Sequence, residues 1–400
     1  MPSYLFEWLS LLGRWLHIIV AMAWIGASFY FVWLDNHLLA PTDPQLKEKG
    51  VSGELWAVHG GGFYNAQKYL LTPDTIPSPL HWFKWEAYWT WLSGFFLLCV
   101  VYYSSPTLYL MDPSVANISP VQAVLIGLGS LGLGTFLYDR LCASPIGNDS
   151  RRLTLVITLL LIAAAYGYCH VYSGRGAFIH MGALMGTIMV ANVFFVIIPG
   201  QRELILAKME QRPPDPRHAL RGKQRSVHNT YFTLPVVFIM ISHHYAMTYA
   251  HPYNWLILIG LCFAGALIRI SFVARHKGPL AKLPLIVAAL LLAAVAYVLA
   301  PPTPTTTASS NKALNRVSFT QVQSIITNRC TPCHSANPTQ PGFSVAPKNI
   351  QFNRAEQILS MAQPIYEQTS KRIMPLGNLT GITEEERQLI AQWATELEKK

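Results

Sequence analysis

The strongest constraint on this 400-residue chain is a succession of long apolar segments that carry almost no charge. The chain is 52% hydrophobic and only 12% charged, whereas an ordinary soluble domain has about 25% charged residues. A helix that crosses a bilayer needs about 20 mostly apolar residues. We therefore predict an all-α, eight-helix transmembrane bundle within residues 1–300. Its spans lie near 10–33, 85–104, 118–137, 153–172, 177–198, 230–249, 253–273 and 281–300.

The basic residues predict how this bundle is oriented. The loops after the third, fifth and seventh spans are rich in Lys and Arg, while those after the second and sixth have neither. Basic loops stay in the cytoplasm, so an even number of spans puts both termini outside. We therefore attribute the net charge of +10 to basic loops that orient the protein in a lipid bilayer, and we expect no nucleic acid partner. The basic positions are Arg140, Arg151, Arg152, Arg202, Lys208, Arg212, Arg217, Arg221, Lys223, Arg225, Arg275, Lys277 and Lys282.

The composition changes after the last apolar segment. Residues 301–313 form a Pro/Thr/Ser linker without apolar periodicity, and residues 314–400 have the composition of a small soluble domain. Two helix capping boxes occur in this domain, Ser318 with Gln321 and Thr383 with Glu386. They predict helices over 319–329 and 384–398 on either side of an irregular middle.

The soluble domain contains a C-x-x-C-H sequence, the attachment signature of c-type haem. Cys330 and Cys333 would bind the porphyrin covalently, and His334 would be the proximal iron ligand. A Met as sixth ligand raises the haem potential and suits electron transfer. Met374 precedes a Pro in a loop and is preferred to Met361, which a helix would place in the core. We predict one haem c in a class I-like cytochrome domain; a zinc or redox Cys pair is the alternative.

Ionisable side chains inside membrane spans are costly and usually functional. Five histidines fall in or beside the spans, all in the outer half of the bilayer once the topology is imposed. They could ligate one or two non-covalent b haems or a metal; the alternative is a set of hydrogen-bonded core histidines. Two of them are adjacent and would point about 100° apart on a helix, so that they could not both face one iron. The five are His17, His170, His180, His243 and His244.

The long first cytoplasmic loop combines glycines, aromatic residues and lysines. Glycines let backbone N–H groups approach an anion, and aromatic faces stack on planar heterocycles. This composition predicts a site for a flat, anionic, electron-rich substrate; the alternative is a Gly-rich turn beside an interfacial aromatic belt. The candidate catalytic residues are His59 and Lys68, and the candidate substrate-binding residues are Gly60, Gly61, Gly62, Tyr64 and Lys84.

The chain resembles the bacterial membrane-bound, cytochrome c-linked urate oxidases, also called urate hydroxylases. The resemblance is carried by four stretches: His17 with Trp24-Ile-Gly, the loop from His59 to Tyr64, the run from Leu80 to Trp91, and Arg372-Ile-Met-Pro-Leu-Gly-Asn. It implies oxidation of urate to 5-hydroxyisourate in a bacterial inner membrane, with the cytochrome domain in the periplasm. Electrons would pass to haem c, then to another cytochrome c and a terminal oxidase, without formation of hydrogen peroxide.

Two other functions are compatible with the residues alone. The first is a non-catalytic electron-transfer subunit, with membrane haem b and fused haem c, that serves a separate dehydrogenase. The second is a transport or haem-handling protein whose cytochrome is a sensor. Reduction of the purified protein's own haem by urate alone would exclude the first, and urate-independent ligand uptake in proteoliposomes would favour the second.

Overall fold

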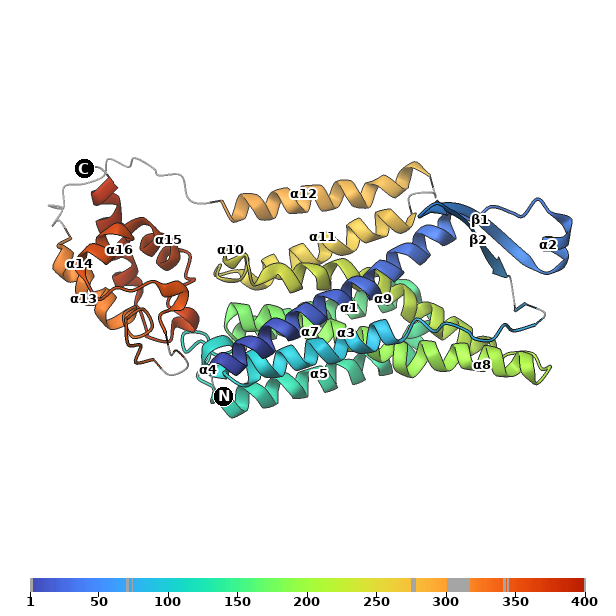
Figure 1. The fold of residues 1–400 in the computed structure, drawn as a ribbon, viewed down its shortest axis with the longest axis horizontal. Coiled ribbons are helices and arrows are strands. Elements are labelled where there is room, and N and C mark those ends of the chain that lie inside the picture. The colour runs from blue at the N-terminus through green and yellow to red at the C-terminus, as the bar shows by residue number, and fades with distance from the viewer. Residues whose placement is uncertain are drawn as a thin grey trace.

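A computed structural model describes residues 3–69, 72–73, 75–274, 278–300, 317–340, 343 and 345–398. Its elements form an elongated molecule with a helical bundle in the middle, a smaller helical domain at one end and a β-hairpin at the other (Figure 1). The predicted linker 301–313 lies outside the described residues, as do the basic residues Arg275 and Lys277.

Each of the eight apolar segments coincides with helix. The bundle helices are α1 (Ser3–His37), α3 (Trp85–Leu97), α5 (Pro120–Ala143), α6 (Ser150–Val171), α7 (Gly174–Ala191), α8 (Ile198–Met209), α9 (Pro216–Ser242), α11 (Asn254–Ala274) and α12 (Leu283–Val298). Two π-helical segments prolong helices of the bundle, η1 (Leu98–Tyr103) after α3 and η3 (Asn192–Ile197) between α7 and α8. Short elements connect them: α2 (Pro44–Glu48), α4 (Pro106–Tyr109), η2 (Pro145–Asn148), α10 (Ala246–Tyr249) and η4 (Pro279–Lys282).

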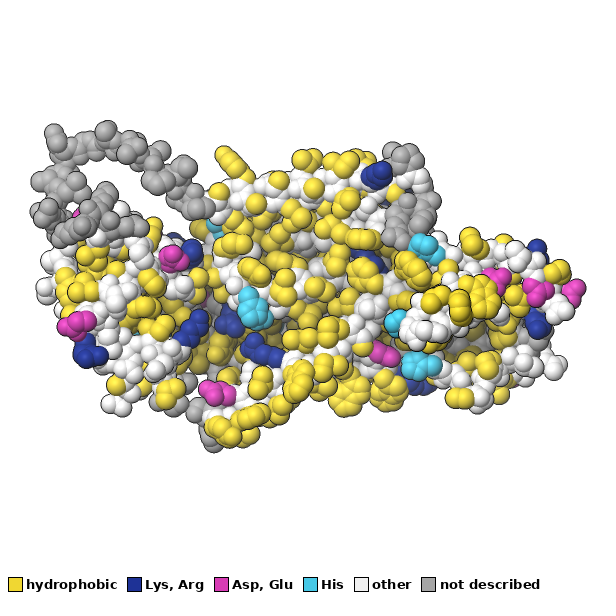
Figure 2. Space-filling view, turned by 45° about the horizontal axis from the view of Figure 1, so that its top comes forward, with side chains coloured by type: hydrophobic (Ala, Val, Ile, Leu, Met, Phe, Trp, Pro, Cys, Tyr) yellow, Lys and Arg dark blue, Asp and Glu magenta, His cyan; other side chains and the backbone are white. Residues whose placement is uncertain are grey.

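Five helices among the described residues are long and apolar enough to cross a membrane: α1, α5, α6, the rod α7–η3–α8, and α11. The count of eight spans stays a prediction, because α12 is shorter, α3 passes into a π segment and α9 begins with charged residues. Hydrophobic side chains cover the middle of the molecule, and most acidic side chains lie toward its two ends (Figure 2). This distribution, like the length of the apolar helices, is compatible with a membrane protein.

The all-α prediction is wrong in one place, because the first long loop contains a β-hairpin. Strands β1 (Val51–His59) and β2 (Gly62–Tyr69) pair antiparallel, with His59 opposite Gly62. Gly60 and Gly61 have φ values of +57° and +80° and form the two-residue turn. A tight hairpin turn of this kind needs positive φ at both positions, which the consecutive glycines supply. The glycines thus have a structural reason to be there.

The C-terminal domain has its own hydrophobic core, around Ile326, Ile358, Ile390 and Trp393. Its elements are α13 (Phe319–Arg329), η5 (Pro347–Asn349), α14 (Ala355–Ser360), α15 (Ala362–Ser370), η6 (Leu376–Asn378) and α16 (Glu384–Glu398). The helices predicted from the two capping boxes are confirmed, and both boxes form their reciprocal hydrogen bonds.

Candidate functional site

The C-x-x-C-H residues follow directly after α13. Both cysteines are free, and Cys330 is the C-terminal cap residue of the helix. The Nδ1 of His334 lies 3.0 Å from the backbone oxygen of Ile350, and since a carbonyl only accepts, Nδ1 carries the proton. Nε2 therefore keeps its lone pair, the state in which a histidine ligates iron. The donor set fits a covalently attached haem.

Met374, the predicted sixth ligand, lies in the irregular segment between α15 and η6. The guanidinium of the buried Arg387 donates to the backbone oxygens of Met374, at 3.0 Å, and Thr369, at 2.5 Å, which fixes the start of this loop. Met361, the rejected alternative, lies between α14 and α15 and packs against the domain core. Met361 thus packs against the core as expected but lies between two helices and not within one, and the choice of Met374 as the iron ligand stays a prediction.

The Met374 loop also contacts the bundle. Gly377 in η6 has φ +55°, and a Cβ added there would lie 3.0 Å from the backbone oxygen of Met111 and 3.5 Å from that of Leu108. These two residues belong to the segment around α4, at the end of the bundle where α1 begins (Figure 1). The loop that would carry an axial ligand is therefore a part of the C-terminal domain that lies against the bundle.

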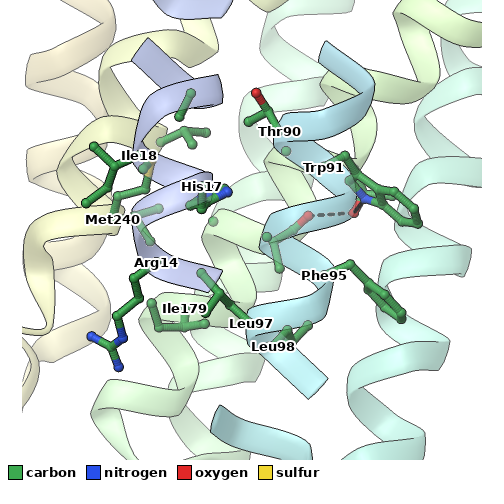
Figure 3. A pocket seen from close by; sticks show the side chains of 18 of the residues that line it. Arg14, His17, Ile18, Thr90, Trp91, Phe95, Leu97, Leu98, Ile179 and Met240 are labelled. Carbon is green, nitrogen blue, oxygen red and sulfur yellow. Dashed lines mark hydrogen bonds between the residues drawn. The ribbon is translucent and has the colours of Figure 1, made fainter. Parts of the chain in front are cut away.

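A cavity of about 490 Å³ lies inside the bundle between α1, α3, α7 and α9. Its lining is mostly apolar, but it includes Arg14 and three of the five predicted histidines, His17, His243 and His244. Arg14, His17 and Ile18 come from one face of α1, and Figure 3 shows the wall formed by α3 from Thr90 to Leu97 and by Leu98 at the start of η1. None of the lining residues is acidic.

The other two histidines are elsewhere. His180 is fully buried, donates from Nδ1 to the Gly176 oxygen at 2.9 Å and accepts from the Tyr103 hydroxyl at 3.1 Å. Both of its nitrogens are thus used, as expected for a hydrogen-bonded core histidine. His170 is exposed on the outside of α6 and stacks on Tyr166. The structure therefore brings together three of the five histidines.

One geometric expectation is wrong. His243 and His244 were expected to point about 100° apart on a helix, but α9 ends at Ser242 and both residues lie in the following turn. Their ring centroids are 3.8 Å apart, and both rings line the same cavity. The sequence continues apolar up to residue 242, which gave no signal for this helix end.

A cleft lies at the cytoplasmic end predicted for the bundle, opposite to the soluble domain. Lys84, Trp85, Tyr88, Phe194 and Arg202 are among its lining residues. The Nζ of Lys84 lies 5.5 Å from the Trp85 ring centroid. The Tyr88 ring meets the Trp85 ring edge-on and the Phe194 ring at a tilted angle. Neither cation forms an ion pair with a described carboxylate. Such a cleft combines positive charge with aromatic faces.

The other loop residues predicted as a site lie on the hairpin and not in either cavity. His59, Gly60, Gly61 and Tyr64 are exposed near the hairpin turn, and Gly62 is half-buried. Lys68 pairs with Asp35 through an Nζ–Oδ1 distance of 2.8 Å. Of the predicted substrate-binding residues, Lys84 is thus the one in a cleft; the roles given to the hairpin residues stay predictions.

The comparison with known families decides the family of the chain. A family model described as "Urate oxidase N-terminal" matches residues 3–300. The chain belongs to the urate oxidase N-terminal family. No curated protein and no solved structure matches it. The match covers the bundle, the cavity and the cleft of this urate oxidase family member, and it ends before the soluble domain with its C-x-x-C-H sequence.

Sequence reasoning missed several polar residues of the urate oxidase N-terminal region. The position of Arg202 in a basic loop predicts only a topological role, yet Arg202 lines the cleft, and Arg14, for which the sequence predicts no role, lines the cavity. The buried Arg225 donates to the Asp139 carboxylate at 2.8 Å and lies over the ring of Tyr138. An arginine before or within an apolar segment is the signal that could have found them, because such a charge needs a partner.

Proposed function

We propose that this protein is a membrane oxidoreductase that oxidises urate to 5-hydroxyisourate and passes the electrons to its own haem c. The proposal is carried by one observation, the urate oxidase N-terminal match over residues 3–300 in a chain that continues into a C-x-x-C-H domain. In balanced form, one urate monoanion and one water give 5-hydroxyisourate, one proton and two electrons. The haem c supplies a one-electron acceptor, so each turnover needs two transfers.

Urate binds in the cleft between α3 and η3–α8. Lys84 and Arg202 attract the monoanion, and the faces of Trp85 and Phe194 hold the flat purine ring. His81, whose Nε2 lies 3.5 Å from a carboxylate oxygen of Glu86, does not line the cleft and would take up the released proton through water. Water reaches the oxidised ring from the open side of the cleft.

The electrons leave toward the other end of the molecule. Along α3, Trp85 and Tyr88 line the cleft, whereas Trp91 and Phe95 line the cavity and stack with centroids 5.2 Å apart. Ten helical residues separate Trp85 from Phe95, a rise of about 15 Å. At the outer end, Tyr102 and Tyr109 contact edge-on with centroids 5.9 Å apart, next to the α4 segment that Gly377 approaches.

His334 and Met374 would hold the iron of haem c, and Cys330 and Cys333 its porphyrin. Arg387 orients the loop of Met374, and the Ile350 oxygen orients the His334 ring. A second cytochrome c and a terminal oxidase would take the electrons outside the inner membrane. In this orientation both termini and the cytochrome domain are periplasmic, and the basic loops are cytoplasmic.

The test uses the full-length protein with matured haem c, purified in detergent and kept free of oxygen. Urate alone should reduce the haem c, and with added oxidised cytochrome c two equivalents should be reduced for each urate lost. In water enriched in oxygen-18, the label should appear in the product. If urate leaves the haem oxidised while a chemical reductant reduces it, the protein is an electron carrier for another enzyme and the proposal is refuted.

A further inference from the structure

We propose that the cavity between α1, α3, α7 and α9 binds a haem non-covalently, with His17 and His243 as its axial ligands. The role of this b-type haem as a relay between urate and haem c rests on the proposed function. The presence of this haem does not rest on the proposed function, because it is inferred from the histidine nitrogens, the size and the charge of the cavity.

The two histidines present free ring nitrogens. The Nδ1 of His17 lies 3.0 Å from the hydroxyl of Ser93, and that hydroxyl donates to the Trp89 oxygen at 2.6 Å. Since the hydroxyl proton is already used, Nδ1 of His17 is the donor and Nε2 keeps its lone pair. A second-shell hydrogen bond of this kind sets the tautomer of metal-ligating histidines.

His243 is arranged in the same way. Its Nε2 is buried and has no hydrogen-bond partner in the described part of the chain. The Met240 backbone lies close enough to the ring to stabilise a proton on it, and since Nε2 has no partner this proton would sit on Nδ1. A buried nitrogen without a partner is costly unless a ligand satisfies it. His17 comes from α1 and His243 from the turn after α9, and both line the same cavity, as two axial ligands must.

The size of the cavity fits a large planar group. Its volume of about 490 Å³ lies within the range of roughly 300–1,000 Å³ that cofactor-sized ligands occupy. Glycines line two walls: Gly186 of α7, whose added Cβ would meet nothing within 4 Å, and Gly94 of α3, whose added Cβ would lie 2.9 Å from the His17 ring. The open space beside Gly186 leaves room for a macrocycle, whereas the space beside Gly94 is occupied by the ring of the proposed ligand His17.

The charge of the cavity fits the propionate edge of a haem. Arg14 lies one turn outward of His17 on α1, where Figure 3 shows it below the histidine. Its Nε donates to Ser10, and it forms no ion pair with any carboxylate in the described residues. Arg175, a second arginine without an ion pair among the described residues, does not line the cavity and packs over the Tyr109 ring at 5.1 Å. Cations in the membrane without acidic partners call for an anionic ligand.

Two other ligands, urate and a quinone, fit this cavity less well than a haem. Urate would fill only a small part of the cavity, and the cleft with Lys84 and Arg202 offers it a site of its own scale. A quinone needs hydrogen-bond donors at its carbonyl oxygens, whereas the unoccupied ring nitrogens of His17 and His243 are acceptors. A metal porphyrin takes two such nitrogens directly.

The experiment measures haem in the full-length, matured protein without urate. Acid–acetone extraction removes non-covalent haem and leaves haem c, so both are quantified in one sample by their pyridine complexes. We expect about one extractable haem for each covalent haem in the natural protein. His17→Ala and His243→Ala should each lower the extractable haem by about tenfold or more, with the covalent haem unchanged.

His170→Ala is the matched control, because His170 is an exposed histidine of the same membrane region that lies outside the cavity. It should keep the extractable haem. In each variant, an unchanged amount of covalent haem shows that the protein still folds. Gly186→Leu fills the cavity while both ligands stay intact, and it should also lose the extractable haem. The proposal is overturned if the natural protein yields no extractable haem, or if the two ligand variants keep it. Urate oxidation without extractable haem would leave the proposed function standing and refute only this site.

Discussion

The contact between the Met374 loop and α4 makes a quantitative prediction for Gly377→Ala. Gly377 has φ +55°, a conformation that costs a residue with a Cβ about 1–2 kcal/mol. This cost falls on the loop itself and is shared by Gly381→Ala. The new Cβ of Gly377→Ala would also lie 3.0 Å from the Met111 oxygen, an overpacked contact that costs about 1–2 kcal/mol more and is relieved when the C-terminal domain moves away from the bundle. A loss of about 1–2 kcal/mol corresponds to a factor of about 5–30 in the docked population.

If electrons reach haem c through this contact, the variant should be reduced by urate about 5–30-fold more slowly in a stopped-flow measurement. The visible spectrum and midpoint potential of haem c should be unchanged, which checks that Met374 still ligates. Gly381→Ala is the control, because Gly381 also has a positive φ, +64°, but its added Cβ would meet only Arg329 of its own domain. Equal rates for Gly377→Ala and Gly381→Ala would refute a role for this contact in electron transfer.

Three further outcomes are expected. Lys84→Ala removes one cation from the cleft, which should weaken urate binding by about 1–2 kcal/mol and raise the KM for urate about 5–30-fold. His59→Ala should leave this KM unchanged. The opposite result in steady-state kinetics would show that urate binds at the hairpin. Met374→His should keep the covalent haem and lower its midpoint potential in a redox titration, since a thioether ligand raises it; an unchanged potential would exclude Met374 as ligand. Arg225→Met should lower the free energy of unfolding by about 1–3 kcal/mol. This loss is smaller than that expected for breaking a fully buried ion pair, because the Asp139 side chain is 40% exposed. An unchanged melting temperature would show that the Arg225–Asp139 ion pair contributes nothing to stability.

The helices were predictable because their signals are local. Apolar length located the bundle helices, and the capping boxes at Ser318 and Thr383 gave the first and last helices of the soluble domain to the residue. The hairpin was missed because its glycines also fit an anion-binding loop, and only strand pairing separates the two. The end of α9 was missed because no Gly or Pro marks it.

The candidate site was only partly predictable, because it depends on which helix faces pack together. Sequence order places five histidines at similar depth, but it does not show that His180 uses both nitrogens within the core or that His170 faces outward. Likewise, Lys84 and Arg202 are 118 positions apart in the chain, from 84 to 202, and only tertiary packing brings them to one cleft. The haem c residues stay a prediction that rests on local spacing alone, because C-x-x-C-H is itself the attachment signature.

The separation of the cleft and the cytochrome domain at opposite ends of the bundle has an energetic consequence. In the proposed orientation, each electron moves from the negative interior of the cell to the positive exterior. Moving one charge through the membrane voltage is worth about 2.3 kcal/mol per 100 mV. Two electrons per urate would therefore gain about 4.6 kcal/mol from a 100 mV potential. Purine breakdown would then be faster in energised membranes and would discharge them slightly at every turnover.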